Sequence, residues 1–339
     1  MSESLHPYET LTPDVVMDAL AAIGLYGDGR LMALSSYENR VYQAHLEEPC
    51  QGHAIVVAKF YRPGRWSEAQ IAEEHAFSAE LAAAEVPAVA PLVIDGRTLH
   101  HHAGFAFSVS PRRGGRTPEL DDGEVLEWIG RFLARLHIVG AQRPFVARPA
   151  LDVQTFAIEP RDWLLANGAI PLEVEGEWRR KCELAIETIA AHAVLAGAAG
   201  TFPSKVQRIR LHGDCHPGNI LWTPGAGPHF VDLDDARTGP AVQDLWMLLS
   251  GDRSQQQRQL GALLDGYEQM REFDRAELAL IEPLRTLRLI HYSYWLARRW
   301  EDPAFPRAFP WFGTPDYWRD QVVMLEDQLE AMEKPPLVA

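Results

Sequence analysis

The chain has 339 residues, of which 47% are hydrophobic and 23% are charged, a composition typical of a soluble globular protein with a sizeable core. Its 32 Lys and Arg residues against 47 Asp and Glu residues give a net charge of −15, which argues against nucleic acid or an anionic membrane as the main partner. The three cysteines, Cys50, Cys182 and Cys215, are too scattered for a disulfide framework or a CxxC metal site. The scattered cysteines, with no visible signal sequence or membrane-length apolar run, lead us to expect a cytoplasmic protein. We also expect a monomer.

The first 110 residues predict a small α+β unit. Apolar periodicity after Thr12 predicts a short helix over residues 13–25, and a second helix over residues 66–85 ends before Pro87. Strands are expected at residues 31–34, 40–46, 54–60, 92–94 and 105–109. The strand at 54–60 is a near-continuous apolar run that contains a single lysine, Lys59. We therefore expect residues 1–110 to form a lobe with a five-stranded sheet.

Residues 111–116, Pro-Arg-Arg-Gly-Gly-Arg, separate this unit from the rest and are the expected hinge. Residues 117–339 predict a mostly helical lobe with one short strand pair around residues 209–233. The expected helices are residues 125–136, 178–195, 242–249, 259–270, 275–300 (interrupted at Pro283) and 318–332. The fold class is thus α+β, with a strand-rich first lobe and a helical second lobe.

The stretch HGDCHPGN at residues 212–219 carries the strongest chemical signal. It is a polar loop that leads into a short strand, and a Pro/Gly turn returns the chain to Asp232. Such a hairpin predicts that Asn219 lies close to Asp232, and an amide oxygen beside a carboxylate suits Mg²⁺. Asp214 would then lie one loop away, where it could accept a proton from an attacking hydroxyl.

These residues resemble the kinase catalytic set HxDxxxxN followed by a metal-binding Asp. In finer detail they are similar to the aminoglycoside phosphotransferase/choline kinase branch of the protein-kinase-like fold. The segments SYENRVYQ (36–43), VAKFYRPGRW (57–66) and VDLDDARTGPAVQDLWMLL (231–249) resemble the RdoA-like family of bacterial stress response kinases. Residues 282–311 extend this likeness, so it covers nearly the whole chain.

The resemblance implies a bilobal protein-kinase-like fold and a role for each matching residue. Asp214 would be the catalytic base, and Asn219 and Asp232 would bind Mg²⁺. Lys59 would contact the ATP phosphates, with Glu74 as its helix partner and Glu73 as the fallback. Ser36, in the turn between the first two strands, would be an ATP contact. Asp244 would brace the catalytic loop through backbone amides.

The chain also departs from the protein-kinase pattern. Residues 34–40 contain no GxGxxG, so Ser hydroxyls and backbone amides would have to hold the phosphates. The metal strand reads Asp-Leu-Asp rather than DFG, and no APE-bounded activation loop follows. The sequence leaves open the roles of Asp234, Asp235 and Cys215.

Two histidine clusters have competing interpretations. The run His212-x-Asp214-x-His216 could bind a metal, but the companions Asn219 and Asp232 favour the kinase interpretation, in which His212 is structural. The tract at residues 100–102 consists of three histidines, and we interpret it as a solvated hairpin turn rather than a metal site.

The implied activity is transfer of the ATP γ-phosphoryl group to a hydroxyl, with Mg²⁺ as cofactor. The family likeness implies a serine/threonine protein kinase of a bacterial stress response, whose partner is a protein bearing Ser or Thr. A small-molecule kinase that acts on an aminoglycoside-, choline- or homoserine-like alcohol would use the same residues. The acidic residues Asp234 and Asp235 would suit a cationic substrate. A non-catalytic nucleotide-binding pseudokinase is the third alternative.

Overall fold

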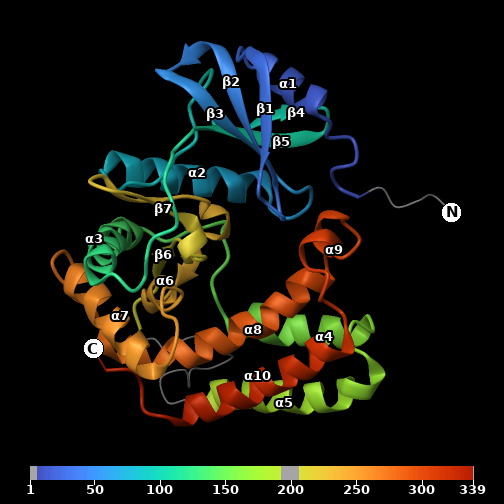
Figure 1. Cartoon of the computed structure of the whole chain (residues 1–339), viewed down its shortest axis with the longest axis vertical. Coiled ribbons are helices and arrows are strands. Elements are labelled where there is room, and N and C mark those ends of the chain that lie inside the picture. The colour runs from blue at the N-terminus through green and yellow to red at the C-terminus, as the bar shows by residue number, and fades with distance from the viewer. Residues whose placement is uncertain (1–5, 192–205, 339) are drawn as a thin grey trace.

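The computed structural model describes residues 6–191 and 206–338. A small sheet-containing lobe lies over a larger, mostly helical lobe (Figure 1), so the predicted bilobal α+β class is confirmed. Two buried hydrophobic clusters correspond to this division, one on a single face of the five-stranded sheet and one through the helical part. The exact limits of the lobes, with a hinge at residues 111–116, stay a prediction.

The sheet of the small lobe is antiparallel, with the strand order β1-β2-β3-β5-β4. Its strands are β1 (Gly27–Leu34), β2 (Arg40–Cys50), β3 (His53–Phe60), β4 (His100–His102) and β5 (Phe105–Pro111). Strand β3 buries Val56, Ala58 and Phe60 on one face. Since neighbouring side chains alternate across a strand, Lys59 points to the opposite face, toward the large lobe.

Two helices accompany this sheet. Helix α1 (Pro13–Ala21) begins after Thr12, whose side chain accepts from the amide of Val15. Helix α2 (Glu68–Ala83) begins with a capping box between Ser67 and Gln70. Figure 1 shows α2 between the sheet and the helical lobe, and its apolar residues Phe77 and Leu81 belong to the hydrophobic cluster of the helical part.

The strand predicted at residues 92–94 is wrong, and so is the solvated turn predicted at residues 100–102. Ile94 makes only an isolated bridge to Arg97, whereas residues 100–102 form β4. The cause is a second tight turn at Ala103-Gly104, where both residues have positive φ, 48° and 84°. This turn sets the three histidines opposite β5, where His100 is buried against Phe107.

The large lobe is built from packed helices. They are α3 (Gly123–Gly140), α4 (Glu159–Ala166), α5 (Leu172–Ala191), α6 (Val242–Trp246), α7 (Arg253–Tyr267), α8 (Ile281–Ala297), α9 (Ala304–Ala308) and α10 (Pro315–Glu333). A π-helical segment, η1 (Gln154–Ile158), runs into α4. In the core, α5 and α10 meet where Trp178 packs edge-on against Trp318, with ring centroids 5.8 Å apart.

Some predicted helices differ in their limits. Pro283 does not interrupt α8 but lies in its first turn, where a missing amide proton costs nothing. The 3₁₀ segment η5 (Arg275–Leu280) precedes it. Helix α5 begins six residues before the predicted 178, and residues 192–195 of that prediction lie outside the described residues. Helices α4 and α9 were not predicted.

Two short strand pairs position the polar loops of the large lobe. Strands β7 (Ile220–Thr223) and β8 (Gly227–Phe230) form the predicted hairpin, with Ile220 opposite Phe230. Strand β6 (Ile209–Leu211) pairs instead with β9 (Arg237–Gly239). The loop that follows β6 and the segment that follows β8 are therefore brought together.

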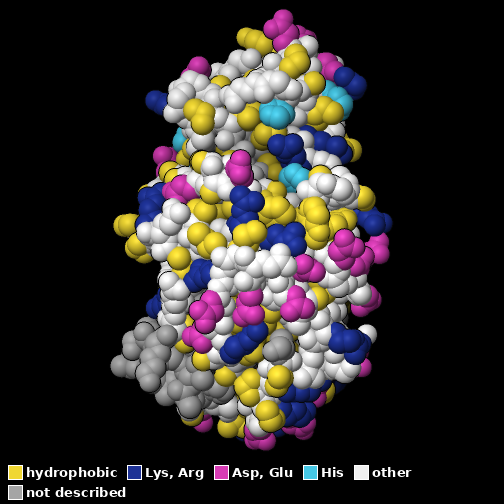
Figure 2. All heavy atoms as spheres, turned by 90° about the vertical axis from the view of Figure 1, so that its left-hand side faces the viewer, with side chains coloured by type: hydrophobic (Ala, Val, Ile, Leu, Met, Phe, Trp, Pro, Cys, Tyr) yellow, Lys and Arg dark blue, Asp and Glu magenta, His cyan; other side chains and the backbone are white. Residues whose placement is uncertain are grey.

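In the part of the chain that the structure describes, no helix is both long and apolar enough to cross a membrane. Figure 2 shows one face of the molecule, on which acidic, basic and hydrophobic side chains are interspersed. The negative net charge thus does not form one continuous acidic surface on this face.

Candidate active site

Asp244 holds the start of the loop at residues 212–219 in place through backbone amides, which is the bracing role predicted for it. This fully buried carboxylate accepts hydrogen bonds from the amides of His212 (2.8 Å) and Gly213 (2.9 Å). Burial raises the pKa of Asp244, but the hydrogen bond and charge of His137, together with His212, outweigh burial and lower it. A charged brace thus fixes the backbone immediately before Asp214.

His212 connects this loop to the end of β8. Its Nε2 lies 2.9 Å from the carbonyl oxygen of Val231, and its Nδ1 accepts from the amide of Asp214. Because both ring nitrogens are engaged by backbone groups, His212 is a structural residue, as predicted. Among residues 6–191 and 206–338, no three His, Cys, Asp or Glu side chains form a metal-binding cluster.

Asp214 lies at the centre of the loop and has three polar neighbours. Its Oδ1 lies 2.7 Å from Nη1 of Arg288, a residue of α8. Its Oδ2 lies 3.6 Å from Nε2 of His216 and 3.4 Å from Nδ2 of Asn219. The carboxylate is partly accessible, with 22% of the side chain exposed, so a hydroxyl from solvent can reach it.

The β7–β8 hairpin brings Asn219 and Asp232 together, as predicted. The amide of Val231 donates to the carbonyl of Asn219 at 3.0 Å, which sets Asp232 next to the start of β7. Asp232 adopts a left-handed backbone conformation (φ 58°) that turns the chain out of β8. Its carboxylate is half exposed.

The donor set of these two residues fits a hard divalent cation. The side-chain nitrogen of Asn219 donates to the carbonyl of Asp214 at 2.9 Å, which leaves its amide oxygen available as a ligand. Asp232 adds carboxylate oxygens, and oxygen ligands of this kind suit Mg²⁺ or Ca²⁺.

Lys59 reaches this pair from the small lobe. Its ammonium lies 2.9 Å from Oδ1 of Asp232 and 3.1 Å from Oδ1 of Asp234. Burial lowers the pKa of Lys59, but Asp232 and Asp234 outweigh burial and hold it well above its usual range. The lysine is therefore charged and lies beside the predicted metal ligand.

Of the two predicted lysine partners, Glu74 rather than Glu73 faces Lys59. Glu73 accepts three backbone amide hydrogen bonds from residues 146–148 and is committed to that loop. Glu74 is buried, and its charge helps to raise the pKa of Lys59. In the described structure, however, the ion-pair partners of Lys59 are Asp232 and Asp234 rather than Glu74. Burial raises the pKa of Glu74 to about 7.

Ser36 lies in the expected β1–β2 turn but makes a local contact. Its hydroxyl donates to the carbonyl of Asn39 at 3.1 Å. The structure brings together Lys59, Asp214, Asn219 and Asp232, with Glu74 buried near enough to act on the lysine by charge. It does not draw Ser36 into that group.

Asp234 and Asp235, whose roles were open, are paired with cations. Asp234 is buried and contacts Lys59, Arg65 and Asn39. Nη2 of Arg65 contacts both carboxylate oxygens of Asp235 (2.8 and 2.9 Å), and Asp235 also binds Arg237 at 2.7 Å. Burial raises the pKa of Asp234, but Lys59 and Arg65 outweigh burial and lower it to about 2.

Cys215, the other open residue, is fully buried beside Asp214 in the sequence. Burial raises the pKa of its thiol well above the usual range, as do the charges of Asp244 and Asp214. A protonated, inaccessible thiol is a packing residue rather than a reactive one.

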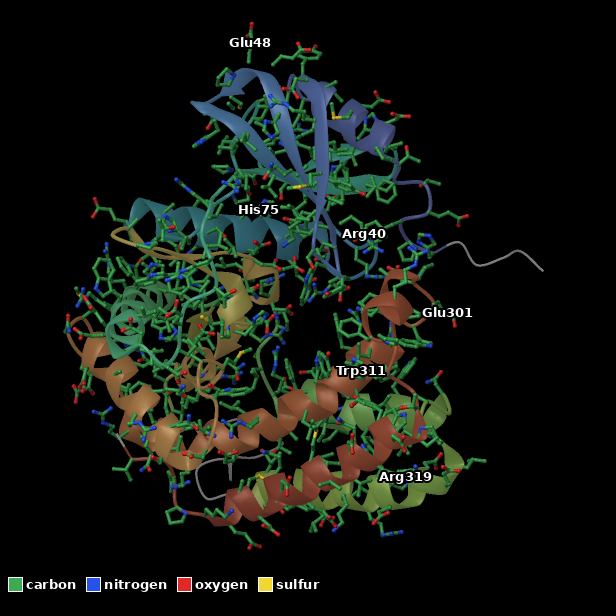
Figure 3. The ribbon with its side chains drawn as sticks, in the orientation of Figure 1. Arg40, Glu48, His75, Glu301, Trp311 and Arg319 are labelled. Atoms are coloured by element: carbon green, nitrogen blue, oxygen red, sulfur yellow. The ribbon has the colours of Figure 1, made fainter. Side chains whose placement is uncertain are left out.

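Sequence reasoning missed a set of ion pairs that ties the β1–β2 turn to the large lobe. Nη2 of Arg40 contacts both carboxylate oxygens of Asp302 at 2.8 and 2.9 Å, and Arg62 contacts the same carboxylate at 2.6 Å. Glu38 binds Arg299 at 2.5 Å. Figure 3 shows Arg40 at the lower edge of the small lobe, above the segment that contains Glu301. The arginines of the motif FYRPGRW were visible in the sequence, but their partners Asp302, Asp234 and Asp235 lie more than 150 residues away.

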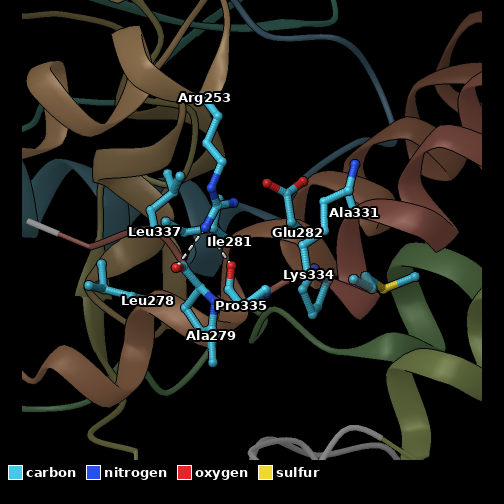
Figure 4. Close-up of a pocket in the computed structure, with 12 residues that line it drawn as sticks. Arg253, Leu278, Ala279, Ile281, Glu282, Ala331, Lys334, Pro335 and Leu337 are labelled. Atoms are coloured by element: carbon cyan, nitrogen blue, oxygen red, sulfur yellow. Dashed lines mark hydrogen bonds between the residues drawn. The ribbon is translucent and has the colours of Figure 1, made fainter.

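Two cavities lie elsewhere. One of about 190 Å³ lies between the starts of α7 and α8 and the C-terminal segment (Figure 4), where Arg253 donates to the carbonyls of Pro335 (2.6 Å) and Pro336 (2.8 Å). Another of about 410 Å³ lies beside the turn at Asp95. None of the predicted site residues lines either cavity.

Residues 31–281, about three quarters of the chain, match the model of the phosphotransferase enzyme family (APH). The chain belongs to this family. A curated phosphotransferase relative, stress response kinase A of Escherichia coli K12, is 45% identical over 99% of this chain and 98% of its own length. The serine/threonine protein kinase RdoA of Salmonella typhimurium is 44% identical over the same shares.

Solved structures show that this phosphotransferase shares its fold with small-molecule kinases. Amicoumacin kinase hAmiN, solved with AMP-PNP and Ca²⁺, matches with a TM-score of 0.70 and 20% identity over 98% of both chains. A microcompartment-associated aminopropanol kinase matches with a TM-score of 0.69 and 18% identity, over 95% of this chain and 98% of its own. The predicted family and fold are confirmed.

Proposed function

We propose that this phosphotransferase moves the γ-phosphoryl group of ATP to an alcohol, with Asp214 as the base and Mg²⁺ as the metal. The observation that carries the proposal is the contact between Lys59 and Asp232 at 2.9 Å. It joins the predicted phosphate-binding lysine of the small lobe to the predicted metal ligand of the large lobe. A site that gathers a fixed cation, oxygen ligands and a base is suited to phosphoryl transfer.

In the proposed reaction the acceptor hydroxyl lies at Asp214. Its proton passes to the carboxylate as its oxygen bonds to the γ-phosphorus, while the bond from the γ-phosphorus to the β–γ bridging oxygen breaks and ADP leaves. The positive charge of Lys59 attracts the phosphates, and the charge of the buried Glu74 favours the protonated form of this lysine. Asp244 keeps the loop in place through the amides of His212 and Gly213.

Asn219 and Asp232 are the residues that would hold the divalent cation. A bound Mg²⁺ would neutralise phosphate charge in this otherwise negative protein. Ser36 stays a proposed ATP contact through its turn. We further propose that residues 111–116 act as the hinge and that the enzyme works as a cytoplasmic monomer.

We propose a serine or threonine of a protein as the acceptor and a bacterial stress response as the context. The support is the likeness, at 44–45% identity over almost the whole chain, to proteins named stress response kinase A and serine/threonine protein kinase RdoA. A small alcohol is the second candidate, because the structural neighbours include an amicoumacin kinase and an aminopropanol kinase. These matches carry less weight for the acceptor, at 18–20% identity.

The test is transfer of radiolabel from [γ-³²P]ATP in the presence of Mg²⁺. Purified full-length protein is offered generic protein substrates in one set and small alcohols in the other. Label in protein serine or threonine supports the first acceptor class, and label only in small alcohols replaces it with the second. Binding of Mg²⁺-ATP without transfer to any acceptor, or to water, would make the chain a pseudokinase.

A further inference from the structure

Arg288 lies directly beside the carboxylate of Asp214, which an acceptor hydroxyl must approach. It extends from α8 and places Nη1 2.7 Å from Oδ1 of Asp214, while 37% of its side chain stays exposed. A hydroxyl that gives its proton to this carboxylate must come within about 3 Å of it. A hydroxyl oxygen at Oδ1 then lies within about 6 Å of Nη1, since the two distances add, and the groups bonded next to that hydroxyl lie near the guanidinium.

The nearby acidic side chains do not offer free negative charge to an acceptor. Asp234 is neutralised by Lys59 and Arg65, and Asp235 by Arg65 and Arg237. Glu38 and Asp302 are likewise paired with arginines. The idea that Asp234 and Asp235 attract a cationic substrate therefore has no support in the described contacts.

Arg288 differs from these paired residues in one respect. Its partner, Asp214, is the proposed base, and that carboxylate must turn to the acceptor hydroxyl during the reaction. When it does, a half-exposed guanidinium is left beside the acceptor. Guanidinium groups bind carboxylates and phosphates through paired N–H donors, whereas a cationic group at the same place would be repelled.

We propose that Arg288 is a specificity-determining residue that selects acceptor alcohols carrying an anionic group close to the hydroxyl that is phosphorylated. This inference rests on the proposed phosphoryl transfer at Asp214. The shared chemistry is a carboxylate or phosphate beside an alcohol. It occurs in serine or threonine peptides flanked by acidic residues, and in small hydroxy acids or phosphorylated alcohols.

The experiment compares matched acceptor pairs on the full-length protein with Mg²⁺-ATP. One arm uses serine peptides that differ only in Asp or Lys beside the serine. The other arm uses small hydroxy acids against amino alcohols of the same length. The kcat/KM for each acceptor is measured for the wild type, Arg288→Gln and Arg288→Lys.

Arg285→Gln is the control variant. Arg285 lies on the same helix but pairs with Glu282 at 2.9 Å and stacks over Trp246, without a contact to Asp214. Its substitution removes the same charge from α8 and should leave acceptor preference unchanged.

We expect the wild type to prefer the anionic member of at least one arm. Arg288→Gln should reduce that preference roughly 10- to 100-fold, the range for a hydrogen bond between charged groups, and Arg288→Lys should keep part of it. A residue that only held Asp214 in place would instead slow both members of a pair equally. The arm in which the preference appears identifies the source of the anion.

Two results overturn the inference. One is ATP turnover with no preference or a cationic preference in the wild type. The other is an anionic preference that survives Arg288→Gln. If neither arm nor water accepts phosphate from ATP, the proposed function itself fails, and this inference falls with it.

Discussion

The ammonium of Lys59 lies 2.9 Å from the carboxylate of Asp232, so a residue of β3 is ion-paired with a residue that follows β8. This pair spans the two lobes and joins the two groups that are proposed to bind phosphate and metal. With Mg²⁺-ATP bound, Asp232 would be a ligand of the metal and Lys59 would contact the phosphates. The ion pair thus holds both side chains close to their proposed working positions.

Removing the lysine charge should impair use of ATP. For Lys59→Met we expect kcat/KM for ATP to fall by about 10²-fold or more, because a fixed cation at developing phosphate charge is lost. An ADP-release assay at saturating acceptor measures this. Lys181→Met is the control, since Lys181 pairs with Glu326 on the surface. Equal activity of Lys59→Met and the control would contradict the assigned role.

Metal removal should abolish transfer reversibly. Chelation by EDTA should stop the reaction, and excess Mg²⁺ should restore it. Asn219→Ala should raise the Mg²⁺ concentration for half-maximal rate by at least about tenfold, as an oxygen ligand is lost. The matched control is Asn167→Ala, whose side chain only caps the end of α4 through Trp163. A Mg²⁺ requirement that is the same in both variants would remove Asn219 from the metal site.

Glu74 should make stability depend on pH. Burial raises its pKa from 4.5 to about 7, so between these values the folded state binds more protons than the unfolded state. Stability from this group is complete below the unfolded pKa and is lost as pH rises through the folded one. The unfolding free energy of the wild type should therefore fall relative to Glu74→Gln by up to about 1.4 kcal/mol per pH unit.

Urea unfolding of both proteins at pH 5, 6 and 8 measures this difference. Burial also raises the pKa of Glu277 to about 7, so Glu277 adds pH dependence of the same sign to both proteins. Subtraction of the two curves isolates Glu74. A difference that stays constant across these pH values would show that Glu74 titrates near its ordinary pKa.

Arg65 should be important for folding stability. Its side chain is 12% exposed and is the shared partner of Asp234 and Asp235. Arg65→Leu leaves these carboxylates partly uncompensated, which should lower the free energy of unfolding by about 3–5 kcal/mol. Arg116→Leu breaks an exposed pair with Glu119 and should cost about 0–1 kcal/mol. Urea unfolding compares them, and similar losses would refute a structural role for Arg65.

The local patterns of the sequence predict much of the fold. The β7–β8 hairpin follows from two short apolar runs around a Gly-rich turn, and the helix predicted after the N-cap Thr12 begins there. The segment at residues 92–102 could not be predicted as well, because two tight turns follow each other there. The strand that pairs with β5 depends on which of these turns, Asp95-Gly96 or Ala103-Gly104, closes the hairpin, and the two turns have similar compositions.

For the candidate site, too, the sequence predicts the local contacts but not the contacts between distant segments. The motif spacing predicts that Asp214, Asn219 and Asp232 lie together, because they belong to one loop and one hairpin. It does not predict Arg288, which reaches Asp214 from a helix more than 70 residues later in the chain. Nor does it predict that Asp234 and Asp235 are neutralised, since Lys59 and Arg65 come from the other lobe. Contacts between the lobes depend on how the lobes pack together, and the local sequence pattern does not predict that packing.

Asp214 is proposed to accept the proton of the hydroxyl that is phosphorylated. The most direct test is the single-turnover rate of phosphoryl transfer from [γ-³²P]ATP by Asp214→Asn, with Asp316→Asn as a control at an exposed surface pair. We predict that Asp214→Asn still binds Mg²⁺-ATP but transfers phosphate about 10²- to 10⁴-fold more slowly than the wild type, while the control is unchanged. Transfer by Asp214→Asn at the wild-type rate would contradict the account.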